Sequence, residues 1–341
     1  MNNISKKAVS AVLSRIPLSL LNNLIHIDVV IAYYHVVSDC QVPHVIYLYD
    51  YKNATQFEND IEFLLKEFSP VSLFDLIKYL KHDNELPKNA FLLTFDDGFS
   101  EMHDMVAPIL LRKGIPATFF ISSDFIDNKK LCYLNKASLL VWSLNHKPAS
   151  SNIEEKVRQI LSDNGMQSND MKSGILSIKY HQRHLLDEIA PIINLDFNEY
   201  LLKNEPYLNS NQINCLIRDG FTIGSHSIDH PLYSELSIKD QLNQTIESVR
   251  NIREKFSLSY GAFAFPHSDN NVSKLFFTEL YRSGLVDISF GTGGLFDDSF
   301  SYNFQRISME KPILPAKNII AFQYIKRLVR ERKGACKIIR R

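Results

Sequence analysis

The sequence is poor in cysteine and has no long hydrophobic run. Four cysteines occur in 341 residues, at positions 40, 132, 215 and 336, and no two of them are spaced as C-x-x-C. The small number and this spacing argue against a disulfide framework, so we expect reduced and mostly packed thiols. A stretch of about 18 uncharged apolar residues is also missing, so we expect no membrane-spanning helix.

The N-terminal segment, residues 1–28, lacks the pattern of a secretory signal. Lys6 and Lys7 precede an apolar run, but Arg15 and Pro17 interrupt it and no small-residue cleavage site follows. We therefore expect a cytoplasmic protein. Residues 5–25 also have the composition of a short amphipathic helix, which would allow peripheral contact with the inner membrane.

Acidic residues are almost absent from the C-terminal end. Residues 326–341 contain eight lysines and arginines and only Glu331, a net charge of +7 that the remaining residues balance with −7. We interpret residues 315–341 as a basic tail. Such a tail is usually solvated, although at an anionic membrane each basic residue contributes about 1 kcal/mol to binding. A basic tail alone is too little to predict nucleic-acid binding.

The chain does contain a regular alternation of strand and helix patterns. Apolar residues make up 45% and charged residues 22% of the sequence, which suits a globular protein with a sizeable core. β-rich runs begin at residues 29, 91 and 116, and segments of helical periodicity separate them. This alternation predicts a parallel sheet or barrel. Residues 128–206 interrupt the rhythm and indicate an inserted helical segment.

Two short motifs carry residues suited to metal chemistry. In "FLLTFDDGFS", Asp96 and Asp97 follow an apolar strand, and two adjacent carboxylates repel each other unless a cation or a proton lies between them. In "FTIGSHSIDHP", His226 and His230 follow another strand, four residues apart, which places both imidazoles on one face of a turn. A carboxylate with two histidines is a frequent ligand set for a catalytic divalent metal.

These motifs resemble those of a known family. "TFDDG" (94–98), "GIPATFFIS" (114–122), "HSIDH" (226–230) and "FAFPHSDNNVS" (263–273) are similar to motifs of the polysaccharide deacetylases, carbohydrate esterase family 4, also called the NodB homology domain. The resemblance covers residues 29–314 and is interrupted by the 128–206 segment. It implies an α/β fold, a distorted (β/α) barrel of the polysaccharide deacetylase type with a helical insertion.

The resemblance also implies an activity and the residues that carry it. Family members are hydrolases of carbon–nitrogen bonds other than peptide bonds, and they remove an N-acyl group, most often acetyl, from amino sugars of cell-surface glycans or glycoconjugates. By this likeness Asp97, His226 and His230 would bind a divalent metal, usually zinc. Asp96 would be the general base that takes a proton from the attacking water. The partner would be an acetylated amino sugar in a glycan or a lipid-linked glycan.

The third motif departs from the family pattern. The backbone N–H after its proline usually stabilises the oxyanion, and here that N–H belongs to His267, which follows Pro266. An arginine is frequent earlier in the motif, but Ala264 occupies that position. Arg306 in "FQRIS" is our candidate to steer the ionisation of Asp96 instead. We assign Pro266, His267 and Arg306 to the substrate-binding part of the site.

The proton donor to the leaving nitrogen is a second departure. Many family members use a histidine near the C-terminal end of the domain, but this chain has no histidine after His267. His35 follows Tyr34 at the end of the first predicted strand, and some branches of the family carry a Y-H dipeptide there. We therefore predict His35 as the proton donor.

Several alternatives stay open on the sequence alone. The enzyme could deformylate or deacylate a lipid-linked or small substrate, or it could remove an O-acetyl group, or the barrel could bind glycans without catalysis. We expect the 128–206 insertion to cap or narrow the cleft and so to set substrate size. Tyr233 and Phe296 are candidates for stacking on a sugar ring.

Overall fold

The computed structural model describes residues 17, 18, 21, 24, 25, 27–147, 150–166 and 170–341. Its centre is a sheet in which neighbouring strands run parallel. Six strands pair in the order β1 (Val29–Tyr34), β3 (Ala90–Phe95), β4 (Ala117–Ile121), β5 (Thr222–Ser225), β6 (Ala262–Ala264) and β7 (Ile288–Gly291). The short strand β2 (Ser69–Pro70) also pairs with β3.

A single stretch of chain joins the two edges of this sheet. Strand β9 (Asn303–Gln305) pairs with β7, and β10 (Ile307–Ser308) pairs with β1. Only Arg306 separates β9 from β10, so the sheet curls into a nearly closed barrel. The predicted α/β barrel is therefore confirmed.

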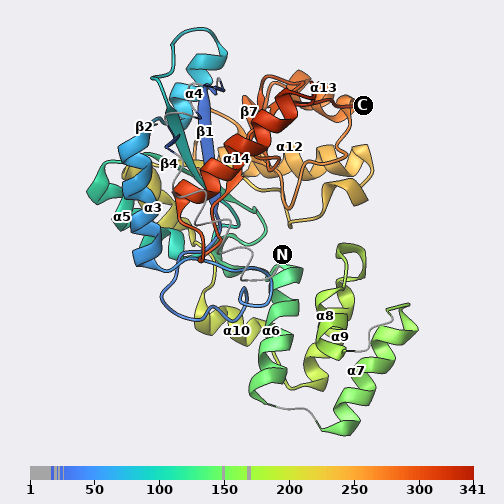
Figure 1. The fold of residues 1–341 in the computed structure, drawn as a ribbon. Coiled ribbons are helices and arrows are strands. Elements are labelled where there is room, and N and C mark those ends of the chain that lie inside the picture. Colours follow the sequence, from blue (N-terminus) through green and yellow to red (C-terminus); the bar gives the residue numbers. More distant parts are fainter. Residues whose placement is uncertain (1–16, 19–20, 22–23, 26, 148–149, 167–169) are drawn as a thin grey trace.

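Helices of the predicted periodicity cover the barrel (Figure 1). They are α3 (Ala54–Glu67), α4 (Leu73–Leu80), η1 (Met102–Val106), α5 (Ala107–Lys113), α11 (Ser210–Arg218), α12 (Ile238–Lys255), α13 (Lys274–Arg282) and α14 (Ala316–Glu331). In α3, for example, Phe57, Ile61 and Leu64 recur at helical spacing and are buried. The Asn53 side chain caps this helix by accepting from the backbone N–H of Gln56.

Alternate residues of the strands pack into two different cores. Phe91 and Leu93 of β3 belong to the cluster beneath the outer helices. Leu92 belongs to a second cluster with Ile31 and Phe290, which fills the barrel and which α4 closes at one end. The polar residues that end the strands are therefore left at the opposite rim, where active sites of β/α barrels gather.

The inserted segment is a helical lobe with its own core. It contains η2 (Ile126–Asn128), α6 (Tyr133–His146), α7 (Ser151–Asp163), α8 (Met171–Leu176), η3 (Tyr180–Gln182), α9 (His184–Ile192) and α10 (Phe197–Asn204). Leu140, Val157, Ile175 and Ile189 are fully buried within this lobe. Figure 1 shows the lobe, in green to yellow, beside the rim of the barrel at which the strands end.

The structure corrects the interpretation of residues 315–341 as a solvated basic tail. Helix α14 buries Ile320 and Tyr324 against the barrel. Beyond it, β11 (Lys337–Ile338) pairs with β8 (Asp297–Asp298), and Arg340 is 7% exposed and ion-paired with Asp298 at 2.6 Å. The basic residues at this end therefore include structural partners of buried carboxylates.

Most of the predicted N-terminal amphipathic helix lies outside the described residues. Of those described, Leu18, Leu21 and Ile25 are buried in the core beneath the outer helices. Within the described part of the chain, the structure contains no helix with the length and apolar character needed to cross a membrane.

Candidate active site

The two adjacent carboxylates sit on a strained turn at the end of β3. Asp97 has φ +74° and Gly98 has φ +73°. A Cβ atom at Gly98 would lie 3.0 Å from the side chain of Ile121, so glycine is required there for both backbone angle and space. The turn sends the two aspartates in different directions: Asp96 faces the barrel interior and Asp97 faces the histidines that follow β5.

Asp97, His226 and His230 form a compact group of metal-ligand atoms. Asp97 Oδ1 lies 3.4 Å from His226 Nε2 and 3.1 Å from His230 Nε2, and one ligand atom from each residue lies within 4.8 Å of the others. Tetrahedral ligands about 2.0–2.2 Å from a zinc ion would be about 3.4 Å apart, so the spacing fits. Asp97 Oδ1 and His226 Nε2 are buried without a hydrogen bond to any described residue, which is typical of ligand atoms.

The surroundings of the histidines favour ligation. His226 Nδ1 donates to the carbonyl of Ala264 at 2.8 Å, which leaves Nε2 free of its proton and turned to Asp97. Burial lowers the pKa of His226 and so keeps this imidazole neutral. Burial also lowers the pKa of His230, but the carboxylate of Asp97 outweighs it and raises that pKa well above its ordinary value. The charge that attracts a proton at His230 would equally attract a metal ion.

Asp96 forms a buried bidentate ion pair with Arg306. The guanidinium donates from Nη1 to Oδ1 and from Nη2 to Oδ2, both at 2.7 Å. It is further held by Thr94 Oγ1 and by the carbonyl of Gly291. Burial raises the pKa of Asp96, but the charge of Arg306 outweighs it and holds that pKa below its ordinary value.

Arg306 cannot bind substrate from this position. Its side chain is 0% exposed and lies among the rings of Tyr33 and Phe120 inside the barrel. The assignment of Arg306 to the substrate-binding residues was therefore wrong, because the segment that closes the barrel turns this side chain inward. Its second predicted role, steering the ionisation of Asp96, agrees with the ion pair.

His35 lies across the site and is fixed by a carboxylate that the sequence did not reveal. Its backbone N–H donates to Glu310 Oε1 at 2.6 Å, and its Nδ1 lies 2.7 Å from Glu310 Oε2. Burial lowers the pKa of His35, but the carboxylates of Glu310 and Asp97 outweigh it and raise that pKa to about 9. The imidazole is therefore protonated at neutral pH.

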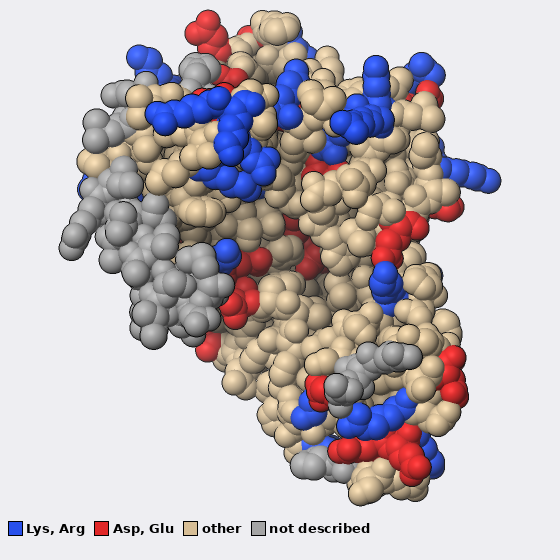
Figure 2. All heavy atoms as spheres, turned by 45° about the vertical axis from the view of Figure 1, so that its right-hand side comes forward, with Lys and Arg blue, Asp and Glu red and all other residues tan. Residues whose placement is uncertain are grey.

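One cavity of about 350 Å³ brings most of the predicted residues together. His35, Asp96, Asp97, His230 and His267 all line it. His226 is 1% exposed and lies beneath the cavity wall. Figure 2 shows a hollow in the molecular surface that contains acidic side chains.

The third motif is held by a network that ends at the last residues of the chain. Pro266 is buried, and His267 follows it at the rim of the cavity with φ +56°. The hydroxyl of Thr292 donates to the carbonyl of His267, and the N–H of Thr292 donates to Asp269. Arg340 forms an ion pair with the buried Asp269, so the C-terminal end fixes the backbone around His267.

The insertion supplies the opposite wall of the cavity. Cys132, Leu134, Asn135 and Leu176 line it, together with a cluster of tyrosines that includes Tyr49. Asn135 Nδ2 donates to the carbonyl of His44 at 2.7 Å, and Ser138 Oγ donates to that of Pro43 at 2.8 Å. These bonds join α6 to the loop after β1, which also lines the cavity.

The sequence missed most of the neutral residues around the cavity. The tyrosine hydroxyl of Tyr49 donates to Asp97 Oδ2 at 3.2 Å, and no motif marks this residue. For Glu310 the one sequence signal is its position four residues after Arg306, just beyond the stretch "FQRIS". The two proposed sugar platforms were wrong: Tyr233 is 0% exposed among phenylalanines, and Phe296 is covered by Lys326 and Arg330.

Comparisons with known proteins agree with the fold and with the first motif. Residues 83–170 match the model of the polysaccharide deacetylase family. Similar solved structures include the Streptococcus pyogenes deacetylase PplD in complex with acetate, with TM-score 0.55 and 12% identity over 87% of this chain and 98% of that chain. IcaB from Ammonifex degensii has TM-score 0.54 and 15% identity over 86% of this chain and 97% of that chain.

A third structure, a de-N-acetylase from Aggregatibacter actinomycetemcomitans, has TM-score 0.53 and 16% identity, with coverage of 88% and 99%. At these identities the likeness is one of fold. No curated protein matches the sequence. The matched segment contains the first motif with Asp96 and Asp97, and the fold unites that motif with the two histidines. The predicted resemblance to the polysaccharide deacetylases is thus confirmed over residues 83–170, and the chain shares its fold with solved deacetylase structures.

Proposed function

We propose that this protein removes an N-acetyl group from an amino sugar of a glycan or glycoconjugate, with the help of a divalent metal, most readily zinc. The observation that carries the proposal is the cavity itself. A paired carboxylate and a protonated histidine line it, and the three clustered ligand atoms lie in its wall or directly beneath it. These are the groups that hydrolysis of an unactivated amide requires.

The surroundings of each residue indicate its role in the reaction. Asp97, His226 and His230 would hold the metal, which when bound supplies a Lewis acid that polarises the acyl carbonyl. Asp96 is kept ionised by Arg306 and accepts a proton as water attacks that carbon. The ion pair also fixes the direction of the carboxylate, which limits its motion during proton transfer.

His35 completes the reaction on the other side of the cavity. A new C–O bond forms to the attacking water and the C–N bond breaks, so the departing nitrogen must gain a proton. The protonated imidazole of His35 supplies it, and Glu310 stabilises the charged ring and holds its orientation. The backbone N–H of His267 is suited to the developing oxyanion. Acetate and a free amine result.

The choice of acetyl as the acyl group is supported by proteins of similar fold, and the cavity volume supports a single sugar unit. Among proteins of similar fold, one is described as a deacetylase in complex with acetate and another as a de-N-acetylase, which supports acetyl as the group removed. The cavity of about 350 Å³ is at the low end of the roughly 300–1,000 Å³ of small-ligand pockets, so it suits one acylated sugar unit. A cytoplasmic location and contact with a membrane stay predictions.

The test is acetate release from chitin oligosaccharides and from lipid-linked N-acetyl sugars, with zinc and after chelation. We expect metal-dependent release that Asp96→Asn lowers at least about 10³-fold, because the base is lost. Asp104→Asn is the matched control, since Asp104 is exposed on η1 and should leave activity unchanged. A protein that binds zinc stoichiometrically but releases no acetate from either substrate would contradict the proposal.

A further inference from the structure

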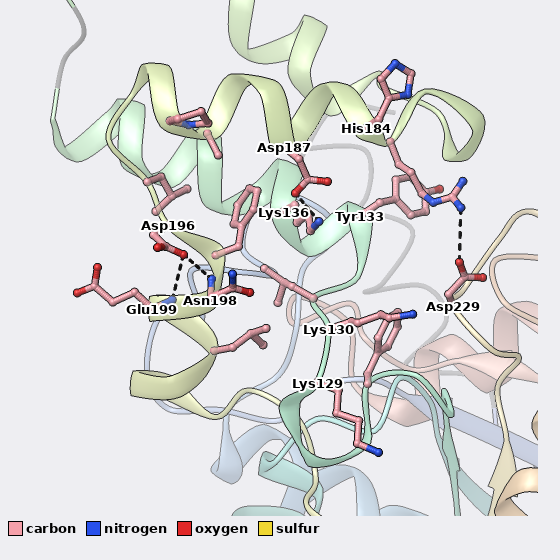
Figure 3. A pocket seen from close by; sticks show the side chains of 18 of the residues that line it. Lys129, Lys130, Tyr133, Lys136, His184, Asp187, Asp196, Asn198, Glu199 and Asp229 are labelled. Carbon is pink, nitrogen blue, oxygen red and sulfur yellow. Dashed lines mark hydrogen bonds and ion pairs between the residues drawn. The ribbon is translucent and has the colours of Figure 1, made fainter.

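A second and larger hollow lies on the insertion, next to the catalytic cavity. It encloses about 1010 Å³ and is formed by α6, α9, α10 and the segment around Lys129 and Lys130 (Figure 3). We call it the insertion groove. Its lining combines an apolar floor with a polar rim. The floor includes the buried side chains of Leu131, Tyr133 and Phe197.

The rim of the groove carries balanced charge. Four basic and four acidic side chains line it: Lys129, Lys130, Lys136, Arg183, Asp187, Asp196, Glu199 and Asp229. Several neutralise one another, since Lys136 Nζ lies 2.6 Å from Asp187 Oδ1 and Arg183 lies 3.9 Å from Asp229. Figure 3 shows the Lys136–Asp187 pair, which joins α6 to α9. A polyanion would meet as much repulsion as attraction here, whereas an uncharged ligand rich in hydroxyls would meet donors and acceptors throughout.

The groove adjoins the catalytic cavity. Phe125 lines both spaces. In the segment between them, Leu131 and Tyr133 line the groove while Cys132 and Leu134 line the cavity, so one thickness of chain separates the two.

The loop after β5, which carries the proposed metal ligand His230, also contacts the groove. Asp229, which precedes His230 in the chain, lines the groove and accepts from the hydroxyl of Tyr180 at 2.7 Å. The insertion is therefore held to the loop that carries His230.

We infer that the insertion groove binds further sugar units of the substrate, an uncharged oligosaccharide chain that continues from the amino sugar in the catalytic cavity. The inference rests on the proposed function, because it assumes that a sugar occupies that cavity. An aromatic and aliphatic floor packs against the apolar faces of sugar rings, and a rim of mixed polar groups pairs with their hydroxyls. The groove has about three times the volume of the cavity, which suits several units.

The first experiment measures kcat/KM on N-acetylglucosamine oligomers of one, two and four units. In the wild-type protein kcat/KM should rise with length by about tenfold or more, as expected from one or two added contacts. In a Lys129→Ala, Asn198→Ala, Glu199→Ala variant this dependence on length should disappear while kcat/KM on the shortest substrate stays unchanged. The three side chains are exposed on the rim, so the fold should persist. Asn198→Trp, which fills the groove, should act in the same way.

The matched control is Glu155→Ala with Lys156→Ala, which removes one charge of each sign from exposed positions of α7 outside the groove. This pair should keep the full dependence on length. Turnover that is equally fast for all lengths in the wild type, or groove variants that lose short and long substrates alike, would overturn the inference and leave the proposed function standing.

A second measurement separates the two proposals. Calorimetric binding of the four-unit oligomer to Asp96→Asn should be tighter, by about tenfold, than binding to the same protein with the three groove substitutions. If no substrate is turned over but this difference persists, the groove assignment holds and the deacetylase proposal fails. Absence of any difference overturns the groove assignment. A dimer that sediments with the wild type and is lost in the groove variants would also overturn it, in favour of a second copy of the chain.

Discussion

The two walls of the catalytic cavity are built in opposite ways. The barrel wall consists of buried charges in pairs, with Asp96 against Arg306 and His35 against Glu310. The insertion wall consists of neutral side chains such as Leu134, Asn135 and Leu176, and Asn135 donates to the backbone carbonyl of His44. Charges in a buried site set protonation states, whereas neutral groups set shape. The barrel wall should therefore govern the chemical step, and the insertion wall should govern which substrates enter.

The largest effect should come from removing a proposed metal ligand. His230→Ala leaves two of the three clustered ligand atoms, so zinc content should fall from about one per chain to near zero and activity should fall at least about 10³-fold. Metal analysis and acetate release measure the two effects. His103→Ala is the control, because His103 lies on η1 and its imidazole pairs with the neighbouring exposed Asp104 rather than with the three clustered ligands. Full zinc binding by His230→Ala would contradict the assigned ligands.

The second-largest effect should come from breaking the Asp96–Arg306 ion pair. Arg306→Gln leaves a buried carboxylate without its cation, so the free energy of unfolding should drop by about 3–5 kcal/mol. The pKa of Asp96 should rise once Arg306 no longer lowers it, so the acid limb of the kcat/KM profile should move to higher pH.

Thermal unfolding and a pH series test both effects of Arg306→Gln. Arg112→Gln removes an exposed pair with Glu58 instead and should cost less than about 1 kcal/mol. An unchanged acid limb in Arg306→Gln would show that another group sets the ionisation of Asp96.

Glu310→Gln should change the alkaline limb of the profile of kcat/KM against pH. The pKa of His35 is raised to about 9 because Glu310 and Asp97 outweigh burial, so the proton donor is present below that pH and is lost as the pH rises through it. Without the charge of Glu310 this pKa should fall, and the alkaline limb should shift to lower pH. Activity at pH 8 should drop about tenfold or more, whereas at pH 6 the loss should be smaller.

The pH dependence separates this role from a structural one. Glu279→Gln removes an exposed carboxylate on α13 and should not move the limb. A uniform loss at all pH values in Glu310→Gln would mean that Glu310 only supports the fold around His35.

The smallest effect should come from the insertion wall. Leu176→Ala removes part of a half-buried side chain that lines the cavity, so KM should change about threefold while kcat stays within about twofold. Steady-state kinetics on the preferred substrate measures this split. Leu202→Ala, at a position 83% exposed on α10, should change neither constant. A large fall in kcat for Leu176→Ala would break the division between the two walls.

Much of the barrel could be predicted because its signals are local. Apolar strands that alternate with amphipathic helices leave few arrangements other than a parallel sheet or barrel. The motifs around Asp96, Asp97, His226 and His230 follow strands β3 and β5, and parallel strands end at the same rim, so their proximity followed from the fold. The same reasoning placed His35 at the rim after β1.

The errors arose where distant segments meet. Arg306 turns inward because β9 and β10 pair with opposite edges of the sheet, and no local pattern reports that closure. Arg340 was interpreted as part of a solvated tail because its partners, Asp269 and Asp298, are far away in the sequence. A run of charged residues in a sequence gives the net charge of the segment, but burial and pairing in the folded protein decide the role of each charge.

The fold class, the family resemblance and the acidic and histidine motifs were predictable because each depends on residues close together in the chain. Three further features appear only in the folded protein: Glu310 fixes His35, Arg306 pairs with Asp96, and the insertion forms a wall of the cavity. These contacts join segments that become neighbours only when the barrel closes and the helical lobe packs against its rim.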